Sequence, residues 1–240
     1  MLMYTVDLSF PTPEENLAYD DALLDLVETE SSNAFLRFWQ TSGFFVVLGH
    51  GNKVSTEVNI EACEKDNVPI FRRQSGGGTI LQGKGVLNYS LILPVDYHPD
   101  LNGITSTNHY VMSQVSEALQ ALDPRVYVNG ITDIVLEDKK IIGNAQRRKR
   151  HAVLFHGCIL VSLDLSLISK YLSHPSDEPD YRQSRSHDEF LTHLPFSELE
   201  IKAALSKHWN AKDCDPPLLN ESVSQKIEGY YAQKSWNYKF

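Results

Sequence analysis

The segment most suited to bind or act on a ligand is RRQSGGGT, residues 72–79. It begins at the end of a strand predicted over 68–73. Three consecutive glycines let the backbone approach a ligand closely and turn its amides toward it. The neighbouring arginines supply fixed positive charge that suits a carboxylate or a phosphate. A glycine-rich turn with its arginines packed elsewhere would have the same sequence. The segment therefore indicates an anion-binding loop but does not by itself establish one.

Four polar residues later in the chain could also carry chemistry. Asp133 and Lys140 flank a predicted hairpin, where a lysine is most often solvated and an aspartate often serves the turn. His156 and Cys158 are two residues apart in a predicted strand, and alternation along a strand directs both side chains to one face. A histidine in an apolar strand is more often a hydrogen-bonded core residue than a ligand. Cys158 is either an activated nucleophile or an inert buried thiol.

The composition is that of one globular domain. The chain has 240 residues, of which 42% are hydrophobic and 22% charged, enough for a sizeable core. We expect a single domain over residues 1–240. The net charge of −9 argues against non-specific binding to nucleic acid, because most of the surface would repel a polyanion.

Targeting and cysteine patterns are also informative. No apolar run is long enough to span a bilayer, and the first residues lack the basic start and apolar stretch of a signal peptide. Three cysteines without a C-x-x-C pair argue against a disulfide framework and a zinc cluster. We expect a cytoplasmic monomer that contacts neither membrane nor nucleic acid.

The pattern of predicted elements indicates an α+β fold. Thr12, Pro13 and Glu15 form the capping box of a first helix, and a second box starts at Ser197. Predicted strands occur in consecutive groups and the helices lie between these groups, which is typical of a mainly antiparallel or mixed central sheet flanked by helices. The polar stretches 173–188 and 210–217 are candidate linkers. Strands are predicted over 35–39, 44–48, 68–73, 86–93, 131–136, 140–146 and 153–161, and further helices over 59–65, 107–122, 164–172 and 221–232.

Three blocks in order resemble the motifs of lipoate–protein ligases, in the biotin/lipoate A/B protein ligase superfamily. They are RRQSGGG…VLNYS (72–90), TDIV (132–135) with KIIGNAQ (140–146), and FHG (155–157). Shorter similarities extend from NLA (16–18) to WNY (236–238), so the resemblance spans nearly the whole chain. It implies a class II synthetase-like fold and a catalytic domain without the C-terminal accessory domain of many relatives.

The resemblance implies an ATP-dependent, protein-modifying ligase with an adenylate intermediate. Lipoate attacks the α-phosphate of ATP to give lipoyl-AMP, and a lysine of an acceptor carrier domain takes the acyl group. Lys140 matches the catalytic lysine, and Asp133 matches the aspartate near nucleotide and Mg²⁺. The residues matched to the lipoyl-adenylate are Arg73, Ser75, Gly76, Gly77, Gly78, Asn88, Asp133, Gly143, Asn144, Ala145, His156 and Gly157. Trp39, Val46 and Leu87 are candidates for the acyl pocket.

The chain also departs from the family pattern. Gln82-Gly83 replaces a usual His-Asp, and Val86 and Thr132 each replace an asparagine. The missing accessory domain implies a one-domain version, a separate partner chain that supplies it, or an activity other than complete ligation. The basic run RRKRH (147–151) is either a solvated loop or a site that binds the adenylate or an acidic acceptor domain.

Two other functions remain open. An octanoyl- or lipoyltransferase would work through a thioester on a reactive cysteine, and Cys158 is the only cysteine near a motif. Some family transferases carry their cysteine just before the strand of Asp133, where this chain reads VYVN (126–129). The departures at Gln82, Gly83 and Val86 would fit a non-catalytic lipoyl-binding protein, against which Lys140 and the glycine loop count.

Overall fold

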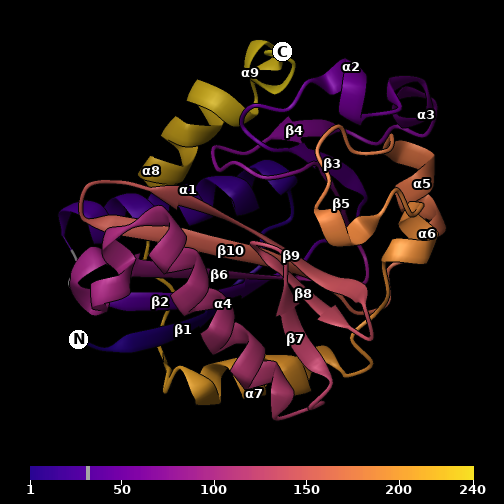
Figure 1. Ribbon diagram of the computed structural model, residues 1–240. Coiled ribbons are helices and arrows are strands. Elements are labelled where there is room, and N and C mark those ends of the chain that lie inside the picture. Colours follow the sequence, from indigo (N-terminus) through magenta and orange to yellow (C-terminus); the bar gives the residue numbers. More distant parts are fainter. Residues whose placement is uncertain (31–32) are drawn as a thin grey trace.

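The computed structural model describes residues 1–30 and 33–240 and contains two β-sheets (Figure 1). The large sheet has the strand order β11-β1-β2-β6-β10-β9-β8-β7, and the small sheet has the order β4-β3-β5. The strands of the large sheet are β1 (Met3–Asp7), β2 (Ala34–Trp39), β6 (Val86–Pro94), β7 (Val126–Asn129), β8 (Asp133–Leu136), β9 (Lys139–Arg148), β10 (Ala152–Leu160) and β11 (Lys212–Asp213). Those of the small sheet are β3 (Phe45–Leu48), β4 (Ile70–Arg72) and β5 (Ile80–Gln82).

Both sheets are mixed, and the large one agrees with the predicted mainly antiparallel or mixed central sheet. β1 runs parallel to β2 and β11, whereas β2, β6, β10, β9, β8 and β7 pair antiparallel. The consecutive strands β2 and β3 belong to different sheets, because both edges of β2 are already paired, with β1 and β6. The stretch 210–217, predicted as a linker, contributes β11 at the edge of the large sheet.

Helices cover both faces of the large sheet. α1 (Pro13–Thr29) and α8 (Asn220–Lys226) pack on one face, and α4 (Ile104–Gln120) and α7 (Glu198–His208) pack on the other (Figure 1). Alternation along β2 directs Phe35 and Trp39 to α1, and Leu36 and Phe38 to α4. Both predicted capping boxes are present, at Thr12 and Ser197. None of the helices in residues 1–30 and 33–240 is long and apolar enough to cross a bilayer.

The small sheet lies beside the large one and packs against short helices, which form a third core cluster. The remaining helices are α2 (Val54–Glu57), α3 (Ile60–Lys65), α5 (Ser166–Tyr171), α6 (His187–Phe190) and α9 (Lys234–Asn237), with 3₁₀ turns at Val95–Tyr97, Pro99–Asn102 and Asp180–Arg182 and a π-helical turn at Ile227–Tyr231. The predicted terminal helix 221–232 is thus α8 followed by that π-helical turn.

A buried ion pair fastens α1 to the large sheet. The guanidinium of Arg37 on β2 is fully buried, and its Nη1 lies 2.6 Å from Asp20 Oδ1 on α1. Arg37 Nη2 also donates to Asn16 Oδ1 at 2.9 Å. The second oxygen of Asp20 accepts a hydrogen bond of 2.7 Å from Ser90 on β6. Asp20 therefore joins α1, β2 and β6. The strand β6 contains VLNYS (86–90), the last part of the first sequence motif.

We predict that Asp20→Ala lowers the free energy of unfolding by about 3–5 kcal/mol, because it leaves the Arg37 charge buried without its partner. Asp7 offers the control, since its side chain is 55% exposed in its pair with Lys202. The loss of this surface pair should cost no more than about 1 kcal/mol. Urea unfolding at pH 7 measures both. Equal losses in the two variants would contradict the assignment of Asp20 as a buried tie.

Candidate functional site

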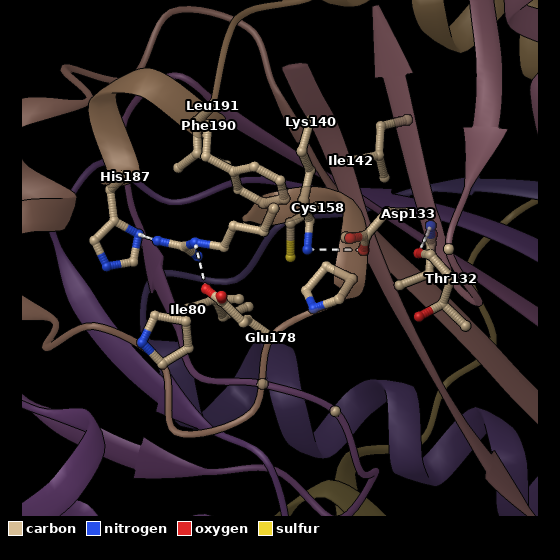
Figure 2. Close-up of a pocket in the computed structure, with 18 of the residues that line it drawn as sticks. Ile80, Thr132, Asp133, Lys140, Ile142, Cys158, Glu178, His187, Phe190 and Leu191 are labelled. Carbon is tan, nitrogen blue, oxygen red and sulfur yellow. Dashed lines mark hydrogen bonds and ion pairs between the residues drawn. The ribbon is translucent and has the colours of Figure 1, made fainter. Parts of the chain in front are cut away.

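A cavity of about 700 Å³ lies between the β8–β9 hairpin, the glycine loop and the segment 173–191 (Figure 2). One part of its wall is polar and another is apolar. The polar part is made by Gly77, Gly78, Thr132, Asp133, Lys140, Gly143 and Asn144. The apolar part is made by Ile80, Leu81, Ile142, Cys158, Leu160, Ile168, Leu172, Phe190 and Leu191.

The hairpin brings Lys140 and Asp133 together. Its turn residues Glu137 and Asp138 have φ of 51° and 64°, a left-handed pair that suits a tight two-residue β-turn. The Lys140 ammonium lies 2.8 Å from Asp133 Oδ1, which Figure 2 shows as a dashed line. The two residues that sequence reasoning placed at the reaction centre are therefore an ion pair on the cavity wall.

A register shift aims the lysine. Asp133 pairs directly with Gly143, and strict alternation would put the side chains of Lys140 and Gly143 on opposite faces of β9. The shift between Ile134 and Val135 adds one residue to β9, and such bulges re-aim side chains. The Lys140 side chain therefore lies over Gly143, where a Cβ would come within 2.8 Å of its Cε. Glycine at this position makes room for the ammonium.

The glycine loop closes another side of the cavity. Gly77 has φ of 82°, a conformation that favours glycine, and a Cβ there would lie 3.3 Å from Ala145 Cβ. The loop thus rests directly on β9, a few residues beyond Lys140. Gly77 and Gly78 line the same cavity as the ammonium.

Arg73 lies behind the loop, outside the residues that line the cavity. Its buried guanidinium donates to the carbonyls of Gly76 at 2.5 Å and Gly78 at 2.8 Å, and to Ser75 Oγ at 2.9 Å. Burial lowers the pKa of Arg73 to about 10, still charged at neutral pH. The Arg73 guanidinium therefore stabilises the conformation of the loop.

Ser75 and His156 connect the loop to β10. Ser75 Oγ lies 2.7 Å from His156 Nε2. The same hydroxyl accepts a hydrogen bond from Arg73 Nε, so Ser75 lies between the guanidinium and the imidazole. Burial, together with the Arg73 charge, lowers the pKa of His156 to about 4, so the ring is neutral at pH 7. Neither side chain lines the cavity.

Arg72 anchors the base of the loop to the C-terminal segment. Its fully buried side chain donates only to backbone carbonyls, and Trp236 Nε1 donates to the Arg72 carbonyl at 2.8 Å. The acceptors are the carbonyl oxygens of Gly49, His50, Asn52, Trp236 and Asn237. The WNY motif at residues 236–238 is therefore a structural partner of the loop.

Cys158 lines the cavity beside a buried pair of amides. Gln82 and Asn88 exchange two hydrogen bonds, of 2.6 and 3.0 Å, and the Cys158 thiol contacts both side chains. Asn88 is thus occupied by Gln82 and lies outside the lining residues. Burial raises the pKa of Cys158 to about 11, which keeps the thiol protonated at neutral pH.

The other predicted residues fall into two groups. Asn144 lines the cavity, and its side chain is fixed by Tyr89 Oη and the Thr132 carbonyl. Gly76, Ala145 and Gly157 are not among the residues that line the cavity. A Cβ at Gly157 would collide with the Asn144 side chain. The three candidates for the acyl pocket are not brought together, because they lie in separate core clusters: Trp39, Val46 and Leu87.

The segment 173–191 contains the site residues that sequence reasoning missed. The stretch 173–188 was a predicted linker, yet Glu178, Tyr181, Arg182 and His187 within it line the cavity. Arg182 is buried, its Nε lies 3.4 Å from Glu178 Oε2, and its guanidinium lies over the ring of Phe190. The available sequence signal for a site in this segment was the closeness of aromatic, arginine and histidine residues within it.

The basic run 147–151 is largely engaged within the chain. Arg147 lies 2.8 Å from Asp21, Lys149 pairs with Asp25, and Arg148 donates to the Leu101 carbonyl. These contacts fasten β9 to α1 and to the turn before α4.

The donor set fits a metal only in part. No group of three or more histidine, cysteine, aspartate or glutamate residues is placed to hold an ion in residues 1–30 and 33–240. Asp133 Oδ1 meets Lys140, and its Oδ2 accepts from Tyr181 at 2.8 Å. Both oxygens are thus engaged, and only their second lone pairs remain. Asp133 could supply at most one oxygen ligand to a Mg²⁺ ion held mainly by phosphates.

Residues 12–203 match the family model described as the lipoyl protein ligase A/B catalytic domain. The chain belongs to this family. It is 31% identical over 161 residues to a probable lipoate-protein ligase A of Mycoplasma pneumoniae, covering 67% of this chain and 46% of that protein. It is 30% identical to lipoate-protein ligase A subunit 1 of Thermoplasma acidophilum, covering 92% of this chain and 90% of that one.

The octanoyltransferase LipM of Halalkalibacterium halodurans is 24% identical and matches 98% of both chains. The chain spans about half the length of the Mycoplasma ligases it matches, 46% of each.

Solved structures of the family confirm the predicted class II synthetase-like fold. A bi-partite lipoate protein ligase from T. acidophilum superposes with a TM-score of 0.84 at 23% identity, over 99% of this chain and 96% of that one. A lipoate-protein ligase A bound with ATP gives 0.81 at 24% identity, over 99% of each chain.

We predict a pH-dependent loss of stability that His156 causes. Its pKa is lower in the folded chain than its ordinary value near 6.5, so the unfolded chain binds more protons between about pH 6.5 and pH 4. Stability must therefore fall as the pH falls through this window. Between pH 7 and pH 5 the natural protein should lose about 2 kcal/mol more than His156→Gln. Urea unfolding at both pH values measures this, and equal losses would refute it.

Proposed function

We propose that this chain is an ATP-dependent lipoate–protein ligase or its adenylating component, which activates lipoate as lipoyl-AMP and transfers the lipoyl group to a lysine of an acceptor carrier domain. The observation that carries the proposal is the cavity itself. The ammonium of Lys140 and the backbone of Gly77 and Gly78 line it together with an apolar wall. A cation, an anion-binding loop and an apolar surface are what this chemistry needs in one place.

Adenylation must bring two anions together. A carboxylate oxygen of the acid attacks the α-phosphorus of ATP, a P–O bond forms, and pyrophosphate leaves with the electrons of the bond that breaks. The Lys140 ammonium can neutralise this charge, because positioning and electrostatic stabilisation dominate such transfers. Among the described residues its ion-pair partner is Asp133, which leaves two N–H bonds for ligand oxygens.

The apolar wall offers a place for the acyl chain. Ile80 on β5, Leu160 on β10 and Phe190 on α6 face the cavity from three elements. Burying the four chain methylenes of lipoate there would contribute about 3 kcal/mol to binding. We therefore propose this wall as the acyl pocket, in place of the predicted Trp39, Val46 and Leu87.

The remaining predicted residues take two kinds of part in the proposal. Asp133, Gly143 and Asn144 share the polar wall with Lys140, where the nucleotide would bind with Mg²⁺. The others support the wall from behind and shape the loop: Arg73, Ser75, Gly76, Asn88, Ala145, His156 and Gly157. Related proteins whose structures hold lipoic acid or ATP share the fold and lend support.

The second half-reaction needs an acceptor. The lysine amine of a carrier domain attacks the acyl carbonyl of lipoyl-AMP, the C–O bond to AMP breaks, and the amine loses a proton. The T. acidophilum ligase is described as bi-partite and was studied with its E2 lipoyl domain. We therefore propose a lipoyl domain as acceptor and a separate accessory chain as partner. A cytoplasmic monomer stays part of the proposal, and the three free cysteines fit a reducing compartment.

Acyl transfer through a thioester is the second candidate. Cys158 lines the cavity, and the similarity to LipM octanoyltransferases spans almost the whole chain. The raised pKa of Cys158 and its contacts with Gln82 and Asn88 oppose it, because the attacking group must be a thiolate.

The test is to incubate the protein with ATP, Mg²⁺ and lipoate, and to measure pyrophosphate release and lipoyl-AMP by mass spectrometry. We expect turnover that Lys140→Met lowers by about 10²- to 10³-fold, as expected when one preorganised donor is lost. Cys158→Ser should keep turnover. Lys139→Met is the matched control, since Lys139 is the exposed neighbour on the same strand.

Other outcomes would replace the proposal. Octanoyl transfer between carrier domains without ATP, abolished in Cys158→Ser, would show a thioester transferase. Retention of lipoate without any turnover would show a non-catalytic binding protein.

A further inference from the structure

A single carboxylate links the reactive lysine to the segment that covers the cavity. Asp133 Oδ1 lies 2.8 Å from Lys140 Nζ, and Asp133 Oδ2 accepts a hydrogen bond of 2.8 Å from Tyr181 Oη. Tyr181 belongs to the segment 173–191 and itself lines the cavity. The Tyr181 hydroxyl is thus connected to the Lys140 ammonium through the carboxylate of Asp133.

The orientation of that carboxylate depends on its hydrogen bonds. The terminal torsion of an aspartate is broad, so covalent geometry alone does not decide where its two oxygens point. Asp133 has one oxygen held by the tyrosine and the other by the lysine (Figure 2 shows the lysine contact). Without the tyrosine hydroxyl, the lysine would be the only one of these two groups that holds the carboxylate, so the ammonium would lose a fixed anchor.

Tyr181 is well placed to hold the carboxylate still. Its ring packs on Phe190 with centroids 5.2 Å apart, and a Cβ at Gly130 would lie 3.4 Å from its Cε1. Burial, and then the Asp133 charge, raises the pKa of Tyr181, so its hydroxyl stays protonated and can donate. A rigid ring with a protonated hydroxyl is a good donor at a fixed position.

We propose that Tyr181 is a positioning residue for the ligase: it orients Asp133, and through Asp133 it fixes the ammonium of Lys140 toward the substrate oxygens. This inference rests on the proposed function. It assigns the tyrosine to the chemical step, because the ammonium is needed where charge develops in the transition state. Removing the hydroxyl should therefore affect kcat more than the KM for lipoate.

The chain contains a matched control. Tyr171 donates to Asp66 Oδ2 at 2.9 Å, and Lys170 Nζ lies 2.6 Å from the same oxygen. The same three residue types meet there, and none of the three is among the residues lining the cavity. Tyr171→Phe therefore removes an equivalent hydroxyl away from the site.

The first measurement is the kinetics of lipoyl-AMP formation. Tyr181→Phe keeps the ring and its packing, and we expect kcat to fall about ten-fold, as for loss of a hydrogen bond to a charged group. The KM for lipoate should stay within about two-fold, and Tyr171→Phe should match the natural protein. In the Asp133→Asn background, Tyr181→Phe should lower kcat no further, because the hydroxyl acts through the carboxylate. Additive effects would overturn the inference.

The second measurement needs no turnover. ¹⁵N relaxation of the lysine ammonium groups reports how firmly each is held, and the order parameter of Lys140 should fall in Tyr181→Phe but not in Tyr171→Phe. An unchanged order parameter in Tyr181→Phe overturns the inference, whatever the activity. A natural protein that forms no lipoyl-AMP overturns the proposed function instead, and the relaxation comparison then decides the positioning of the ammonium.

Discussion

The ion pair between Lys140 and Asp133 is the interaction on which the arrangement of the site depends. Two strands of one hairpin carry its partners, so the left-handed turn and the register shift of β9 set its geometry. Gly143 provides space for the ammonium, and Tyr181 approaches the carboxylate from the cavity cover. A charge on a hairpin would ordinarily be solvated. Here the surrounding elements hold it on the wall of a cavity, where it can act on a ligand.

The arginines beside the glycine loop illustrate a second constraint. A loop without side chains cannot hold its own shape, and both guanidinium groups are buried and bonded to backbone carbonyls. Arg73 gathers the loop, and Arg72 fastens its base to the C-terminal segment. The two guanidinium groups therefore stabilise the structure of the loop and of the segments next to it. Neither guanidinium lines the cavity, whereas Lys140 and the glycines Gly77 and Gly78 do.

Part of the candidate site could be predicted from the sequence, because motif residues carry their spacing with them. Lys140, Asp133 and the glycine loop were predicted to meet, and they line one cavity. The apolar wall was missed, because strands buried on both faces give no sign of which side chain faces a cavity; Trp39 is such a case. The polar, proline-containing sequence of residues 173–188 has neither strand nor helix periodicity and therefore predicts a linker. Its position depends on tertiary contacts such as Tyr181 with Asp133.

The most direct test is a crystal structure of the protein with a hydrolysis-resistant lipoyl-adenylate analogue, in which a sulfamate replaces the phosphate. The account predicts that a sulfamate oxygen lies within about 3 Å of Lys140 Nζ, a normal hydrogen-bond distance. The acyl chain should lie against Ile80, Leu160 and Phe190. An analogue bound with its sulfamate away from Lys140, or with its acyl chain elsewhere in the molecule, would contradict the account.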